Sequence, residues 1–161
     1  TVLPKGQTSS VLSITRSGDP VDVAIPGDAI ALELTDDLDV GRGDVLVVTG
    51  ETPPVATSSI TADVCWFSEV DVQVGDRIVL RHFSRDINAT VSAIDHRLDL
   101  ELLENAPTDR LVLNDIGRIR LTLEEPIVVD LYTQNRVGGS IIGIDPISNG
   151  TVAALLVRET H

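Results

Sequence analysis

Residues 75–82 read Gly-Asp-Arg-Ile-Val-Leu-Arg-His, a turn-forming Gly-Asp pair followed by charged and apolar side chains in alternation. Successive side chains of a β-strand point to opposite faces, so the pattern predicts a half-exposed strand over residues 77–82. Residues 89–94 form a second apolar segment beyond turn residues at 84–86. The two segments together predict a β-hairpin.

The rest of the chain also consists of short apolar segments separated by Gly, Pro, Asp and Asn. Further strands are predicted at residues 11–14, 21–25, 29–34, 45–48, 62–67, 117–123, 127–129, 138–144 and 150–157. The leucine-rich residues 98–104 fit at most about two helical turns, because Pro107 follows closely. This density of strands and turns predicts an all-β fold of the barrel or sandwich kind.

The alternation is lost between residues 49 and 61, where Pro53 and Pro54 stand side by side. A pair of prolines removes two backbone donors and is typical of a connection between modules. We therefore predict a first module over residues 1–51, a linker over residues 52–61 and a second module over residues 62–161.

The charge balance limits the possible partners. The 161 residues include 25 acidic and 12 basic residues, for a net charge of −13. Affinity for a phosphate backbone comes from lysines and arginines that displace counterions, so nucleic acid is not expected as a partner. No segment approaches the roughly 18 apolar residues that cross a bilayer, and no basic-then-apolar leader opens the sequence. We expect no membrane partner and a cytoplasmic location.

Few residues could carry chemistry. Lys5 is the sole lysine and no glycine-rich stretch precedes it, which excludes a Walker-type phosphate loop. His82 and His96 could meet across the predicted hairpin and, with Asp95, form a zinc or general-base set. Both histidines lie beside charged residues, however, which favours solvated side chains. We therefore predict no catalytic, cofactor-binding or metal-binding residues in this chain.

Two stretches of the first module resemble a known superfamily. Residues 25–32, Ile-Pro-Gly-Asp-Ala-Ile-Ala-Leu, and residues 39–46, Asp-Val-Gly-Arg-Gly-Asp-Val-Leu, resemble the second half of the β-barrel that follows the G domain in translation-factor GTPases. A glycine–polar pair precedes one strand there, and an Arg-Gly pair precedes the last.

The second module carries a narrower resemblance. Four stretches in order resemble the GTP-hydrolysing large subunit of bacterial sulfate adenylyltransferase: residues 83–91, 113–121, 125–136 and 144–154. The block that ends in Asn135-Arg136 is the most specific of them. Gly138 stands where that family has threonine, and Ile141 stands where an aromatic residue is usual.

The resemblance implies two small antiparallel β-barrels of the translation-factor domain II and domain III types, with the first barrel incomplete. Residues 1–51 would be the second half of domain II, and residues 62–161 would be domain III, the elongation-factor-type C-terminal barrel. It further implies a preceding G domain that binds GTP and Mg²⁺, and a separate small subunit that converts ATP and sulfate to adenylylsulfate and pyrophosphate. The chain would then be a non-catalytic fragment that couples GTP hydrolysis to this reaction.

These interpretations leave alternatives open. The barrels could belong to a translation elongation factor, or the chain could be an independent β-barrel binding module. We expect Asn135 and Arg136 on an exposed loop that the G domain or the small subunit contacts, with a purely local turn role as the alternative. An incomplete first barrel would also leave a sheet edge open, which predicts a homodimer through residues before Gly50.

Overall fold

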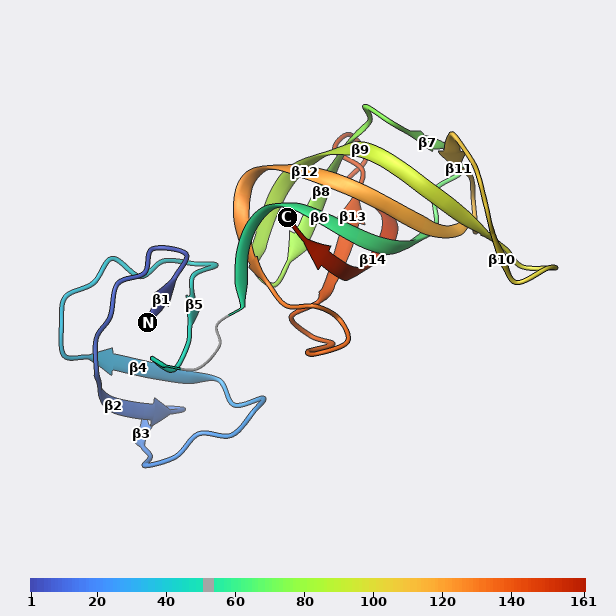
Figure 1. Ribbon diagram of the computed structural model, residues 1–161. Coiled ribbons are helices and arrows are strands. Elements are labelled where there is room, and N and C mark those ends of the chain that lie inside the picture. Colours follow the sequence, from blue (N-terminus) through green and yellow to red (C-terminus); the bar gives the residue numbers. More distant parts are fainter. Residues whose placement is uncertain (51–53) are drawn as a thin grey trace. The chain divides into compact units, whose positions relative to one another are not determined.

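The computed structural model describes residues 1–50 and 54–161, which fall into two compact units, Thr1–Pro53 and Pro54–His161 (Figure 1). All regular structure among the described residues is β-strand, which confirms the predicted all-β fold. The described residues contain no helix long and apolar enough to cross a membrane.

The second unit is a closed antiparallel barrel. Its sheet has the order β10-β9-β12-β6-β14-β13-β8, and β8 also pairs with β9, so six strands close into a ring. Those six strands are β6 (Val55–Trp66), β8 (Arg77–His82), β9 (Arg85–Asp99), β12 (Ile116–Val129), β13 (Ser140–Ile144) and β14 (Thr151–Thr160). A closed ring pairs the backbone groups of every strand, and the barrel therefore has no free edge along the paired stretches.

Three short strands lie outside the ring. The strand β10 (Glu104–Ala106) pairs with the far end of β9, and β7 (Val72–Gln73) pairs with β11 (Arg110–Leu111). The β9–β10 hairpin therefore extends past the barrel wall, as the ribbon in Figure 1 shows.

Alternation explains which side chains fill the barrel. In β8 the buried positions are Ile78, Leu80 and His82, while Arg77 and Arg81 are exposed. In β12 the same period buries Ile119 and Leu121. The interior is almost entirely aliphatic, and Trp66 is its one large aromatic side chain among the described residues. Burial of these branched side chains supplies the main stabilisation, at about 1.5–3 kcal/mol for each fully buried large side chain.

Irregularities in β12 and β9 let the sheet curl. The register between them shifts at Arg118/Ile119 and again at Arg120/Leu121, and such bulges increase local twist. Gly117 lies at the start of this region, where a Cβ atom would stand 2.5 Å from the carbonyl oxygen of His96. Only glycine permits the two backbones to approach so closely.

The first unit is smaller and more open. Here β1 (Val2–Leu3) pairs with β5 (Val45–Leu46), and β2 (Val11–Arg16) lies between β3 (Asp19–Pro20) and β4 (Ile30–Leu34). Val2 is the sole buried hydrophobic residue among residues 1–50. An apolar cavity of about 330 Å³ remains between the two small sheets, lined in part by Val11, Leu32 and Leu46.

The strand predicted over residues 21–25 was wrong, because pairing with β2 ends shortly after Pro20. Val21 donates one last hydrogen bond to Ile14, and the chain then turns through Pro26. The carboxylate of Asp28 accepts a hydrogen bond from the backbone N–H of Ile25 at 3.1 Å, which closes this turn, and another from Nη1 of Arg16 in β2 at 3.0 Å.

Four predictions for residues of the second unit also differ from the structure. Residues 55–61, assigned to a linker, belong to β6, because their partners on β12 extend that strand; residues 52 and 53 lie outside the described residues. The helical alternative for residues 98–104 was wrong, since these residues form a strand end and a hairpin turn. Residues 117–123 and 127–129 are one strand, and the turn expected at 84–86 lies one residue earlier, because His82 pairs with Arg85.

Candidate functional site: the loop between β12 and β13

Residues 130–139 connect β12 to β13 and carry Asn135 and Arg136. Both residues are exposed, whereas Gly138 and Gly139 are buried where the loop meets the barrel. In Figure 1 the loop hangs below the barrel. This loop carries the two residues that the sequence predicts at an interface.

The side chain of Asn135 is used inside the loop. Its Nδ2 donates to Oδ2 of Asp130 at 2.8 Å, and its Oδ1 accepts from the backbone N–H groups of Val137 at 3.1 Å and Gly138 at 3.2 Å. The backbone N–H of Gly139 donates to the Asn135 carbonyl at 2.9 Å. An asparagine that replaces backbone partners in this way fixes the turn. The side chain of Asn135 thus has the local turn role that was the alternative to an interface contact.

Arg136 is placed differently. Its carbonyl oxygen accepts a hydrogen bond from Oγ of Ser140 at 2.6 Å, which fixes its backbone. No acceptor for its guanidinium is found within residues 1–50 and 54–161, and the neighbouring Val137 is also exposed. A free guanidinium on a fixed backbone is suited to a carboxylate of another molecule, because its planar donors match a carboxylate in two hydrogen bonds.

The two glycines hold the loop against the barrel. A Cβ atom at Gly138 would lie 2.1 Å from Oδ2 of Asp130, and one at Gly139 would lie 2.4 Å from the backbone nitrogen of Tyr132. A side chain at Gly139 therefore requires the backbone to move, whereas one at Gly138 requires the side chains of Asp130 and Asn135 to shift.

His82 lies beneath the loop. Its Nε2 is 2.9 Å from the carbonyl oxygen of Gly138, which can only accept, so this nitrogen carries the proton. Burial lowers the pKa of His82, although the Gly138 carbonyl and the charge of Asp130 act to raise it. The prediction of a solvated His82 was wrong, since the inward alternation of β8 continues to its last residue.

The histidines do not form a metal site. His96 pairs with Arg118, eleven residues along β9 from Arg85, the partner of His82. Asp95 instead accepts hydrogen bonds from Nε and Nη2 of Arg120 at 2.9 and 2.6 Å. Among the described residues no group of three or more His, Cys, Asp or Glu side chains could hold a metal ion.

A charged cluster on the barrel wall supports the other end of the loop. Asp63 of β6 accepts hydrogen bonds from Nε of Arg118 at 2.8 Å and Nε of Arg158 at 2.6 Å. Burial alone raises the pKa of Asp63, but these hydrogen bonds and the charges of the two arginines together outweigh burial and leave the pKa lowered. Arg158 also lies over the ring of Tyr132, with its guanidinium carbon 5.8 Å from the ring centre. The cluster thus links three strands to the start of the loop.

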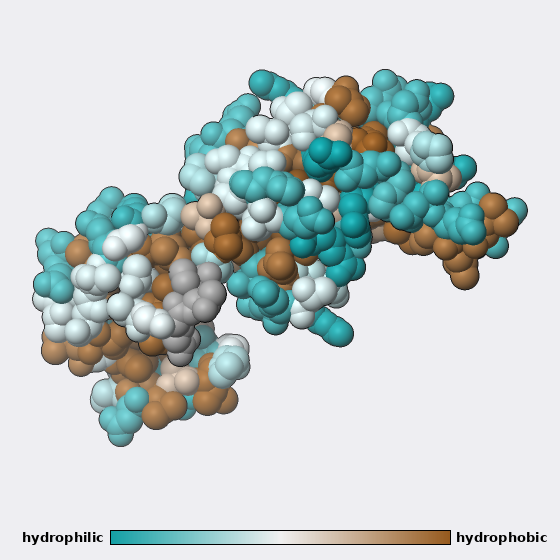
Figure 2. Space-filling view, viewed as in Figure 1, coloured by the Kyte–Doolittle hydropathy of each residue, from teal (hydrophilic) through white to brown (hydrophobic). Residues whose placement is uncertain are grey.

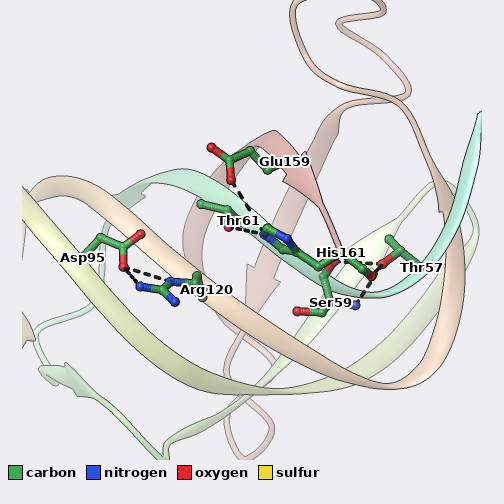
Figure 3. A network of polar contacts seen from close by, with 7 residues as sticks. All are labelled: Thr57, Ser59, Thr61, Asp95, Arg120, Glu159 and His161. Atoms are coloured by element: carbon green, nitrogen blue, oxygen red, sulfur yellow. Dashed lines mark hydrogen bonds and ion pairs between the residues drawn. The ribbon is translucent and has the colours of Figure 1, made fainter.

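A second polar network ties β14 to β6 (Figure 3). Oγ1 of Thr57 lies 2.6 Å from the backbone oxygen of His161, and Oγ1 of Thr61 lies 2.9 Å from Nε2 of His161. Glu159 stands 3.8 Å from the same ring nitrogen. These contacts join two neighbouring strands and have a structural role.

The comparisons with known proteins agree with the geometry. The family model described as GTP-eEF1A C-terminal domain-like matches residues 59–158. Sulfate adenylyltransferase subunit 1 of Citrobacter koseri is 40% identical over 158 residues, which cover 98% of this chain and 33% of that protein. Bifunctional enzyme CysN/CysC of Mycobacterium tuberculosis is 39% identical over 158 residues, which cover 97% of this chain and 26% of that protein.

Solved structures show the same fold. Sup35 complexed with GDP superimposes with a TM-score of 0.87 at 21% identity, over 99% of this chain and 40% of that one. Sup35 complexed with GMPPNP gives a TM-score of 0.88 at the same identity. The chain spans about a third or less of the length of sulfate adenylyltransferase subunit 1 and of the bifunctional CysN/CysC enzyme. The resemblance to the large subunit of sulfate adenylyltransferase is confirmed, and the chain belongs to the GTP-eEF1A C-terminal domain-like family.

Proposed function

We propose that this chain forms the β-barrel part of the large subunit of a sulfate adenylyltransferase. The observation that carries the proposal is the 34–40% identity to subunit 1 of that enzyme, which extends over 98–100% of the chain. In this function the barrels contribute no catalytic residue. They transmit the GTP-dependent state of a G domain to a small subunit that joins sulfate to ATP.

The second unit is built to move as one body. Its ring of strands is closed, its interior is filled by aliphatic side chains, and the described residues contain no buried side-chain N or O atom without a hydrogen-bond partner. A closely packed interior transmits displacement rather than absorbing it. Such a barrel suits rigid-body motion that follows a nucleotide-dependent change in a neighbouring domain.

The loop of residues 130–139 supplies the contact in this proposal. Arg136 offers a guanidinium to a carboxylate of the G domain or of the small subunit, and Asn135 holds the backbone that presents it. The loop is pinned to β14 as well, because Tyr132 donates its backbone N–H to Val157 at 2.9 Å and Val157 donates to Gly139 at 2.9 Å. A partner bound at Arg136 would therefore be coupled to the barrel wall.

The cofactors and location of the proposed enzyme follow from the same reasoning. GTP and Mg²⁺ would bind in the G domain, and ATP and sulfate would bind in the small subunit. The cytoplasmic location stays a prediction.

Reconstitution tests the proposal. The full-length protein and the small subunit, purified together, should form adenylylsulfate and pyrophosphate from ATP and sulfate, with GTP raising the yield and a non-hydrolysable GTP analogue failing to do so. Absence of sulfate-dependent product, together with GTP-dependent binding of aminoacyl-tRNA, would favour the elongation-factor alternative. A full-length protein that binds no nucleotide would favour the independent binding module.

A further inference from the structure

The tip of the β9–β10 hairpin exposes three leucines. Leu100, Leu102 and Leu103 are 60%, 70% and 75% exposed, at the end of a hairpin that extends beyond the barrel. Figure 2 shows hydrophobic residues gathered on this projection, away from the aliphatic interior. A cluster of large apolar side chains on a projecting element is typical of an interaction site.

The turn that carries these leucines is ordered by its own hydrogen bonds. Oδ1 of Asp99 accepts from the backbone N–H groups of Glu101 at 3.0 Å and Leu102 at 3.1 Å, and the Leu103 N–H donates to the Asp99 carbonyl at 2.8 Å. The N–H groups of Leu102 and Glu101 also lower the pKa of the Asp99 carboxyl, which stays ionised near neutral pH. The backbone that carries the leucines is therefore ordered before any partner binds, which reduces the entropy lost on binding.

Leu103 occupies a backbone conformation that favours glycine. Its φ is +57°, in the left-handed region where a branched side chain is strained and glycine is not. The leucine side chain is mostly exposed, so packing within the chain does not compensate for that strain. A strained residue whose side chain makes few contacts within its own chain points to a contact with another molecule.

The charges around the leucines define the partner. Residues 98–106 contain Asp99, Glu101 and Glu104 and no basic residue. Anionic lipid headgroups and nucleic acid phosphates would be repelled by these carboxylates. The same hairpin tip of a second copy would bring a matching set of carboxylates to the contact, which disfavours pairing of the chain with itself at this tip. An apolar pocket bordered by lysines or arginines would complement both the leucines and the carboxylates.

We propose that Leu100, Leu102 and Leu103 insert as a unit into an apolar pocket with a basic rim on a protein partner. Resting on the proposed function, we assign this pocket to the small subunit of sulfate adenylyltransferase. The hairpin tip would then form a docking contact separate from Arg136, with the leucines supplying affinity and the carboxylates supplying orientation.

Calorimetric titration of the full-length large subunit with the purified small subunit tests this. The triple variant Leu100→Ser, Leu102→Ser, Leu103→Ser should bind at least about tenfold more weakly, as expected for loss of a central apolar anchor. A matched control replaces three other strongly exposed aliphatic residues of the same unit, as Val70→Ser, Val74→Ser, Ile147→Ser. This control should bind within about twofold of the unsubstituted protein, as expected for residues outside the contact.

Two further variants separate recognition from folding. Leu103→Gly removes the strain and the side chain together, so it should keep or raise the thermal unfolding midpoint while weakening binding. Glu101→Lys with Glu104→Lys should weaken binding most at low salt, because added salt already screens the attraction that it removes. A lower unfolding midpoint for Leu103→Gly would overturn the inference, since the leucine would then stabilise the fold itself.

These measurements distinguish failure of the docking inference from failure of the proposed function. If the unsubstituted subunits associate and the leucine triple variant associates equally well, the docking inference is wrong and the proposed function stands. If the unsubstituted subunits do not associate at all, the proposed function is wrong. If leucine-dependent binding is instead found to vesicles of phosphatidylglycerol and phosphatidylcholine, the hairpin is a membrane contact and the inference is overturned.

Discussion

His82 joins the barrel interior to the β12–β13 loop through a single hydrogen bond to Gly138. Because burial lowers its pKa below the ordinary value of 6.5, the folded protein binds this proton less readily than the unfolded chain does. The free energy of unfolding should therefore be at its full value above pH 6.5 and fall as the pH drops below it, with a slope of at most about 1.4 kcal/mol per pH unit.

Urea unfolding between pH 5 and pH 8 measures this dependence. His82→Gln keeps an N–H donor near the Gly138 carbonyl but cannot take up a proton, so the pH dependence should shrink. His96→Gln is the control and should retain it, because His82 is left in place. An unchanged dependence in His82→Gln would show that another group is responsible.

Gly139 should tolerate no side chain. The Cβ of Gly139→Ala would stand 2.4 Å from a backbone nitrogen, so the loop or β13 must shift, and we expect a loss of about 1–3 kcal/mol in the free energy of unfolding. At Gly150 an added Cβ would meet only the Ser148 hydroxyl, at 3.3 Å. Gly150→Ala is therefore the matched substitution, and chemical denaturation should show the smaller loss for it.

Asn135 and Arg136 should separate into two roles. Asn135→Ala removes three local hydrogen bonds and should lower the free energy of unfolding by about 1 kcal/mol, a modest figure because the site is exposed. Arg136→Ala should leave thermal stability unchanged and weaken association with the small subunit in a pull-down or titration. Equal binding by Arg136→Ala would remove this residue from the interface.

At the scale of elements, the two units differ in how well their strands are covered. Strands β6 and β12 are paired on both sides and bury many side chains, whereas β2 and β4 bury none fully. Opening of a segment is easier where few apolar contacts hold it. Amide exchange followed by mass spectrometry should therefore show much faster exchange in β2 and β4 than in β6 and β12.

Local alternation predicted most strands of the barrel, including residues 77–82 without error, because a strand that separates core from solvent must alternate. The same alternation, continued from Ile78 and Leu80 to residue 82, would have placed the His82 side chain in the interior. Residues 98–104 were ambiguous, since leucines at 98 and 102 fit a helix while leucines at 98, 100 and 102 fit a strand. Residues 97–99 instead pair with residues 104–106 and residues 100–103 form the turn between them, and sequence periodicity does not contain that information.

The β12–β13 loop was only partly predictable. A polar Asn-Arg pair between two apolar strands indicated an exposed connection, but the roles of the two side chains depend on Asp130 and on the backbone of residues 137 and 138. The exposed leucines of the β9–β10 hairpin were not anticipated, because residues 98–104 were considered only as a short helical segment. The acidic residues between them were the available signal, since a segment buried on all sides leaves no exposed face for Asp99, Glu101 and Glu104.

At the scale of the whole molecule, the chain by itself should not hydrolyse GTP or ATP and should not form adenylylsulfate. Lys5, its sole lysine, is held by the carboxylates of Asp39 and Asp44 at 3.3 and 3.1 Å and follows no glycine-rich loop. Phosphate release and adenylylsulfate formation by the purified chain should stay at the level of buffer. Turnover that disappears on substitution of one residue of the chain would contradict this.

The homodimer also stays a prediction. In the first unit β3 and β4 are the outer strands of a three-stranded sheet, and an apolar cavity lies open beside it. Edge-to-edge pairing through these strands would cover both. Light scattering at rising concentration should show a dimer, and more so at high salt, which screens a charge of −13 on each chain. A monomer with residues 1–48 protected from amide exchange would contradict it.

The first and last strands of the barrel, β6 and β14, are antiparallel neighbours, with Ile60 opposite Thr160 and Trp66 opposite Ala153. The polypeptide thus enters and leaves the barrel at the same end. Tension applied between residues 55 and 160 would load this ladder in the unzipping direction, where backbone hydrogen bonds break one pair after another instead of all together. The barrel should consequently open at low force in a single-molecule pulling experiment, despite its dense interior.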